Sequence, residues 1–284
     1  MNWDIYPLLM GYAYQFYWMT IYDEAADEAK RQEKHVTPFL AFLLKNKETG
    51  EVILVDSGPY NNAKLSASYR GPSYQTPDIR DAVRGYNVDP EDIKTVIITH
   101  LHWDHICGLV DVKDGKTSCK LPNAKIYVHH DELEHMRYVL VHGDIGPDGV
   151  KRPGYSSPFD SLLAEGETPF FKGIMDRFAE LEGEASFRDG IDYYLLPGHT
   201  AGTLGLMINT AYGKYFLTSD LFNTFECWER SLPAGGLYNK DIAFESVAKA
   251  KKLASENDAV FVAPHDFKTL EVLKPFVQVP VVFR

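Results

Sequence analysis

Four side chains that can bind a metal ion stand within six residues of one another, at His100, His102, Asp104 and His105. They directly follow a compact apolar run at 95–99, which predicts a buried strand. Alternate residues of an extended chain point the same way, so His100 and His102 are placed to hold one ion. A turn into a helix would bring Asp104 and His105 toward a second position. Packing alone rarely explains four side chains of metal-binding type so close together in the sequence, so the segment predicts a metal site.

Short apolar runs recur along the chain, and several end at a polar residue that can bind metal. These runs predict strands at 39–45, 51–55, 95–99, 124–129, 192–196, 204–209, 214–218 and 259–263. Residues 46–50 predict the turn of a hairpin between the first two strands. Helices are expected at 76–85, with Pro77 in an early helical position, at 131–141 and at about 242–256.

Three more residues of ligand type follow predicted strands. They are His199 after 192–196, Asp220 after 214–218 and His265 after 259–263. Singly each is a weak signal, because a lone His or Asp after a strand is more often a cap or turn residue. Their order along the chain gives them weight when they are taken together with the 100–105 segment.

The pattern His-x-His-x-Asp-His at 100–105 resembles the signature of the metallo-β-lactamase superfamily. Members have a further His after a middle strand, an Asp after the next hairpin and a last His near the C-terminus, and His199, Asp220 and His265 supply these in order. Residues 197–200 and 55–58 are also similar to superfamily segments. The resemblance covers roughly residues 36–266. It implies an α/β fold, a four-layer αββα sandwich with metal ions at one edge of its two sheets.

The same resemblance assigns a role to each ligand. By analogy His100, His102 and His199 hold the first ion, Asp104, His105 and His265 hold the second, and Asp220 bridges the two. Imidazole and carboxylate ligands without thiolate favour zinc, so we expect two Zn²⁺, with Mn, Fe or Co as alternatives in the same set of ligands. Di-iron members that reduce oxygen have Glu in place of His102, which disfavours an oxidoreductase.

The implied reaction is hydrolysis. Two ions about 3.5–4 Å apart lower the pKa of a shared water, and the bridging hydroxide would attack the carbonyl carbon of a lactone or carboxylic ester. Asp104 is expected to pass a proton to the departing alkoxide, and Asp220 to hold the bridge. The chain looks most like the N-acyl homoserine lactonases, which carry a Tyr three residues after the bridging Asp. Asn223 stands there in this chain and is expected to donate a hydrogen bond to the substrate instead.

Two alternative functions stay open. A thioester or lactam hydrolase would use the same two-metal centre on another bond. A non-catalytic metal-binding module would keep the scaffold alone, which the complete set of ligands disfavours. Aromatic residues, 13% of the chain, gather at 12–22 and 222–228. Most are expected to pack in the core, and any that line the cleft favour an apolar or ring-containing small-molecule substrate.

Composition narrows the class of protein further. The 284 residues, 45% of them hydrophobic, predict a single domain over 1–284, and the net charge of −11 makes nucleic acid an unfavourable partner. Cys107, Cys119 and Cys227 form no paired motif, so a reducing, cytoplasmic location is expected. The uncharged segment 5–22 is interrupted by Pro and Gly and predicts strand and loop rather than a membrane span. Residues 143–171, rich in Gly, Pro and Ser, predict a lid or the arm of a homodimer, or else a solvated insertion.

Overall fold

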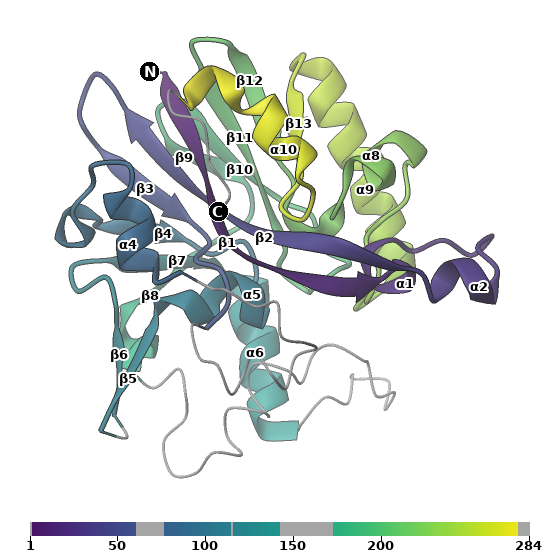
Figure 1. Ribbon diagram of the computed structural model, residues 1–284, viewed down its shortest axis with the longest axis horizontal. Coiled ribbons are helices and arrows are strands. Elements are labelled where there is room, and N and C mark those ends of the chain that lie inside the picture. The colour runs from purple at the N-terminus through teal and green to yellow at the C-terminus, as the bar shows by residue number, and fades with distance from the viewer. Residues whose placement is uncertain (1, 61–76, 115, 143–172, 278–284) are drawn as a thin grey trace.

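The computed structural model describes residues 2–60, 77–114, 116–142 and 173–277 (Figure 1). The expected lid or dimer arm at 143–171 lies outside these residues. Two β-sheets form the centre of the fold, and β5 (Val110–Lys113) pairs with β6 (Lys116–Cys119) in a separate two-stranded hairpin. No helix in the described ranges is both long and apolar enough to cross a membrane.

The first sheet has six strands in the order β1-β2-β3-β4-β7-β8. Their bounds are β1 Trp3–Phe16, β2 Lys34–Asn46, β3 Val52–Val55, β4 Thr95–Ile97, β7 Lys125–His129 and β8 Phe178–Leu181. The second sheet has five strands in the order β13-β12-β11-β10-β9. Their bounds are β9 Ala185–Arg188, β10 Ile191–Leu195, β11 Leu204–Thr210, β12 Gly213–Leu217 and β13 Val260–Val262.

Helices cover the outer faces of the two sheets. Those nearest the first sheet are α4 Ile79–Arg84, α5 Trp103–Ile106 and α6 His130–His142, and those nearest the second are α8 Phe225–Arg230 and α9 Lys240–Glu256. The short helix α10 Lys268–Val272 instead packs against the apolar cluster between the two sheets. Two short helices, α1 Tyr17–Thr20 and α2 Glu28–Arg31, lie between β1 and β2 in the chain. In Figure 1, α4 and α6 lie on one side of the molecule and α8 and α9 on the other.

The alternation of side chains along β2 explains the layers. Ala41 and Leu43 belong to an apolar cluster with α4 and α6, whereas Leu40, Phe42 and Leu44 belong to a cluster with the second sheet. Because successive strand residues point to opposite faces, one buried run serves two cores. A third cluster fills the space between the second sheet and α9. The order helix, sheet, sheet, helix is the predicted four-layer αββα sandwich.

The strand predictions are confirmed in position, with differences at the ends. The strand expected at 95–99 ends at Ile97, because the backbone N–H of Thr99 turns to the Asp56 carboxylate at 2.8 Å. The helix expected from residue 76 begins at Ile79, after its N-cap Asp78, so Pro77 precedes the cap instead of standing in the first turn. Segment 5–22 forms β1 and α1. The sequence interpretation missed α1, α2, β5, β6, β8, β9, α8 and α10, all of them short.

Strand direction brings the ligand-bearing loops together. β3, β4 and β7 run parallel in the first sheet, and β12 and β13 run parallel in the second. β10 is antiparallel to β11, which is antiparallel to β12, so β10 runs in the same direction as β12. The carboxyl ends of parallel strands meet at one edge of a sheet, which is where open α/β folds place their sites.

Candidate metal centre

The seven predicted metal ligands converge at this edge. His100 and His102 follow β4, Asp104 and His105 lie on α5, and the other three follow β10, β12 and β13. His102 is half-buried and the other six are buried. Gly108, at the end of this segment, allows the chain to pass against residues 57 and 58, because a Cβ there would lie 2.0 Å from the carbonyl oxygen of Ser57.

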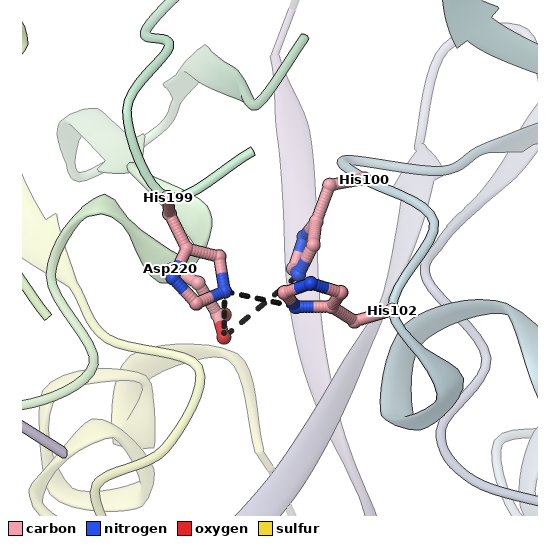
Figure 2. A group of neighbouring side chains, drawn as sticks. All are labelled: His100, His102, His199 and Asp220. Carbon is pink, nitrogen blue, oxygen red and sulfur yellow. Dashed lines mark hydrogen bonds and ion pairs between the residues drawn. The ribbon is translucent and has the colours of Figure 1, made fainter. Parts of the chain in front are cut away.

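His100, His102, His199 and Asp220 form the first ligand group (Figure 2). Figure 2 shows His100 and His102 entering from one side and His199 and Asp220 from the other, with their ring nitrogens and carboxylate oxygen facing a common point. The Nδ1 of His102 lies 2.9 Å from the Nε2 of His199. One Asp220 oxygen, Oδ2, lies 3.4 Å from the Nε2 of His199 and 3.9 Å from that of His100.

Asp104, His105 and His265 form the second ligand group. The Nε2 of His105 lies 3.9 Å from the Oδ1 of Asp104, and the Nε2 of His265 lies 3.6 Å from its Oδ2. Asp220 faces this group with both oxygens: Oδ1 lies 3.2 Å from the Nε2 of His105 and 3.1 Å from that of His265, and Oδ2 lies 3.2 Å from the Nε2 of His265. One carboxylate therefore faces ligands of both groups.

The donor atoms of both groups fit metal ions. A tetrahedral site with bonds of about 2.0–2.2 Å places its ligand atoms roughly 3.3–3.6 Å apart, and the distances given above, from 2.9 to 3.9 Å, bracket this range. The Nε2 atoms of His100 and His105 are buried and make no well-aligned hydrogen bond within the described part of the chain. Buried polar atoms are normally satisfied, so these lone pairs are available to an ion.

Three other groups orient the ligand rings from behind. The Nδ1 of His105 lies 2.9 Å from the Asp56 carboxylate, and the Nδ1 of His265 lies 2.8 Å from the Pro38 carbonyl oxygen. The Nδ1 of His100 lies 3.2 Å from the Ser219 hydroxyl. A partner at one ring nitrogen fixes the tautomer and presents the other nitrogen to a metal. Each of these three rings thus has its Nε2 directed into the centre.

The backbone is held in an uncommon conformation at two of these positions. Asp56 has φ 58° and Ser219 has φ 52°, in the left-handed region that non-glycine residues seldom adopt. The surrounding hydrogen bonds hold both turns, because Asp56 accepts from the N–H and the hydroxyl of Thr99, and Ser219 donates to the Thr99 hydroxyl at 2.7 Å. Conformations of this kind cluster at functional sites.

The two groups differ in charge. Burial lowers the pKa of His102 to about 4 and that of His199 to about 3, and together with the neighbouring His105 it lowers the pKa of His100 well below its usual value. Burial also acts to lower the pKa of His105 and His265, but the negative charges of Asp220 and Asp104 outweigh it and raise the pKa of both. The three imidazoles of the first group are therefore neutral at pH 7, which is the form that binds metal.

Asn223, the residue expected to contact the substrate, is buried beside the centre. Its backbone carbonyl accepts a hydrogen bond from the N–H of His265 at 3.2 Å. Its side-chain Oδ1 makes no hydrogen bond within the residues described. The amide is therefore not engaged by the rest of the protein through that atom.

The sequence did not reveal the roles of Asp56 and Glu132 at the centre. Asp56 falls within the 55–58 segment and Glu132 within the helix expected at 131–141, and the sequence assigns neither of them a role at the centre. Both are buried carboxylates that accept backbone N–H groups from the ligand loops. A buried acidic residue beside an apolar strand end is a signal for such a role, but the sequence does not name its partners.

Curated relatives and solved structures resemble the chain over most of its length. An N-acyl homoserine lactonase AttM from Rhizobium radiobacter is 27% identical over 188 residues, which cover 66% of this chain and 63% of the relative, less than two thirds of its length. An N-acyl homoserine lactonase from a Bacillus species is 24% identical over 250 residues, 84% of this chain and 85% of the relative.

Two solved structures share the fold. An N-acyl homoserine lactone hydrolase with the product N-hexanoyl-L-homoserine at its catalytic metal centre has a TM-score of 0.70 and 20% identity, covering 96% of this chain and 97% of that one. AidC, a dizinc quorum-quenching lactonase, has a TM-score of 0.66 and 20% identity, covering 93% and 88%.

The family model of the metallo-beta-lactamase superfamily matches residues 40–265. The match begins in β2 and ends at the last predicted ligand, so it contains both ligand groups. The fold, the order of the ligands and this match agree. The chain belongs to the metallo-beta-lactamase superfamily.

Proposed function

We propose that this protein is a metal-dependent hydrolase that opens a lactone or carboxylic ester at a two-metal centre. The observation that carries the proposal is the position of Asp220 between the two groups: its Oδ2 lies 3.4 Å from the Nε2 of His199 and 3.2 Å from that of His265, and its Oδ1 lies within 3.2 Å of the Nε2 atoms of His105 and His265. A carboxylate that lies within reach of both sets of ligands suits a bridge between two ions. Imidazole and carboxylate ligands without thiolate favour Zn²⁺.

Two bound ions would supply Lewis acidity for a substrate carbonyl and lower the pKa of a water molecule between them. The chain's residues then divide the remaining work. The neutral imidazoles of the first group need lose no proton before they bind an ion. Asp104 belongs to the second group and is placed to carry a proton to the departing alkoxide.

Asn223 completes the proposed catalytic set of Asp104, Asp220 and Asn223. Its backbone carbonyl accepts a hydrogen bond from the N–H of His265, which places the buried residue beside the second group, and its Nδ2 is the side-chain atom that can donate to a substrate. An amide donor at this position would stabilise the negative charge that develops on the substrate oxygen. Asn thus replaces the Tyr of the lactonases at the same place in the sequence, with a shorter reach.

Two observations support a lactone over the other bonds that superfamily members cleave. The curated relatives are named N-acyl homoserine lactonases. Beside the second group, Phe39 packs edge-on against both Trp103 and His265, with ring centroids 5.3 and 5.5 Å apart. Trp103 is half-buried and presents apolar surface at the centre. We therefore propose an apolar or ring-containing small lactone or ester as the substrate.

The test is hydrolysis before and after metal removal. Purified protein is dialysed against a chelator, and rates are measured on a lactone, a linear ester, a thioester and a lactam before and after Zn²⁺ is restored. We expect the lactone to be opened fastest, activity to vanish with the metal and activity to return with about two Zn²⁺ per chain. Faster cleavage of the thioester or lactam would replace the proposed substrate class, and activity that survives the chelator would refute the metal mechanism.

A further inference from the structure

Glu132, in the first turn of α6, lies buried between the two loops that carry the first ligand group. Its Oε1 accepts a hydrogen bond from the N–H of Leu101 at 2.9 Å, and its Oε2 accepts one from the N–H of Gly202 at 2.9 Å. The hydroxyl of Thr200 also donates to it. One carboxylate therefore receives three donors from two segments about 70 and 30 residues away.

These donors stand beside the first group's histidines in the chain. Leu101 lies between His100 and His102, and Thr200 directly follows His199. The first loop leaves the first sheet and the second loop leaves the second sheet. Glu132 is thus a direct link between the two sheets at the level of the ligands.

The close approach of the second loop is built into the sequence. A Cβ on Gly202 would lie 2.4 Å from the backbone nitrogen of Glu132 and 2.6 Å from its Cβ, so only glycine lets the loop come this near. A buried carboxylate without compensation is unfavourable. No Lys or Arg pairs with Glu132 among the described residues, and burial raises its pKa. The three donors compensate for the burial, which indicates that the carboxylate is kept for its contacts.

We infer that Glu132 is a positioning residue of the first ligand group, holding the 100–102 and 199–203 loops at the spacing that lets His100, His102 and His199 share one ion. The inference rests on the proposed metal centre and adds to it a selective prediction. Among the described residues, Glu132 forms no hydrogen bond or ion pair with Asp104, His105 or His265, and the two histidines are oriented by Asp56 and Pro38 instead. Loss of Glu132 is therefore expected to weaken one ion and spare the other.

The test compares Glu132→Gln with Glu134→Gln, an exposed residue of the same helix. In Glu132→Gln an amide NH₂ faces one of the two N–H donors, so one hydrogen bond is replaced by a repulsive contact. Zn²⁺ is titrated into metal-free protein by calorimetry, and His199→Ala and His265→Ala identify which binding step belongs to which group. We expect affinity at the first group to fall about 10–100-fold in Glu132→Gln, as is common for residues behind a metal ligand. The Zn²⁺ affinity of the second group in Glu132→Gln should stay within about 3-fold of the wild-type value. Both affinities of Glu134→Gln should stay within the same limit.

Each outcome separates the inference from the proposed function. If Glu132→Gln binds Zn²⁺ with wild-type affinity at both steps, or loses affinity equally at both, the positioning role is overturned. The proposed function is not affected by either result, because it depends on lactone hydrolysis by the wild type. A wild-type protein that takes up no Zn²⁺ would overturn the metal centre and the inference together. If circular dichroism shows Glu132→Gln to be unfolded, Thr200→Val removes one donor only. It should then give a smaller loss confined to the first group, and an unchanged affinity there would refute the inference.

Discussion

The two ligand groups sit side by side yet are held in place by different means. In the first, burial leaves three imidazoles neutral, and the loops that carry them are fixed through backbone N–H groups by Glu132. In the second, carboxylate charges raise the pKa of His105 and His265, and side-chain and carbonyl partners orient the rings. Neutral ligands attract one another weakly, so the backbone must place them, whereas a charged set is drawn together by its own electrostatics.

Within the part of the chain that the structure describes, Asp220 is the ligand that serves both groups, and its removal should give the largest effect. In Asp220→Ala we expect both ions to bind far more weakly and lactone hydrolysis to fall at least about 1,000-fold. Metal content by elemental analysis and kcat/KM on a lactone provide the measurement. Asp241→Ala, on the exposed first turn of α9, is the matched control. Loss of only one ion in Asp220→Ala would break the picture of a shared carboxylate.

Asn223 belongs to neither group, and its substitution should separate chemistry from metal binding. We expect Asn223→Ala to keep both ions while kcat falls about 100-fold, because a donor aimed at the developing charge is lost. Metal content and steady-state kinetics on the same preparation check this. A variant with normal kcat would mean that the amide does not touch the reacting carbonyl.

Asp56 should be the counterpart of Glu132 for the second group. Asp56→Asn keeps the shape of the side chain but removes the charge that faces the Nδ1 of His105 at 2.9 Å. We expect affinity for the second ion to fall about 10–100-fold, with the first ion retained. Stepwise Zn²⁺ titration measures it, and Asp81→Asn on the exposed face of α4 is the control. The comparison fails if Asp56→Asn and Glu132→Gln weaken the same ion.

The smallest expected effect is on the pH dependence of metal binding. A raised pKa means that His105 and His265 hold protons at a pH where the metal needs them neutral, so binding at the second group should release protons and weaken as pH falls. The lowered pKa values of about 4 for His102 and about 3 for His199 delay such competition at the first group until the pH is far lower. Calorimetry in buffers of different ionisation enthalpy, from pH 8 to pH 6, would show this. Earlier loss of the first ion would contradict it.

Most of the fold could be predicted because its signals are local. The run at 95–99, the hairpin about residues 46–50 and the helix near 242–256 each carry their own pattern, and each is present with shifted ends. The shifts have tertiary causes. Thr99 leaves the strand because Asp56, 43 residues earlier in the sequence, accepts its N–H. The short edge strands β8 and β9 have mixed burial and no clear alternation, so sequence alone did not reveal them.

The candidate ligands were also found from sequence, because their side-chain types and their places after apolar runs are written in the chain. What only the tertiary structure decided is which groups stand behind them. Asp56, Pro38 and Glu132 act across separations of 31 to 227 residues, through hydrogen bonds that form only when distant strands pack side by side or the two sheets meet. A sequence pattern records what a residue is able to bind, and the packing of the two sheets determines what lies within 3 Å of it.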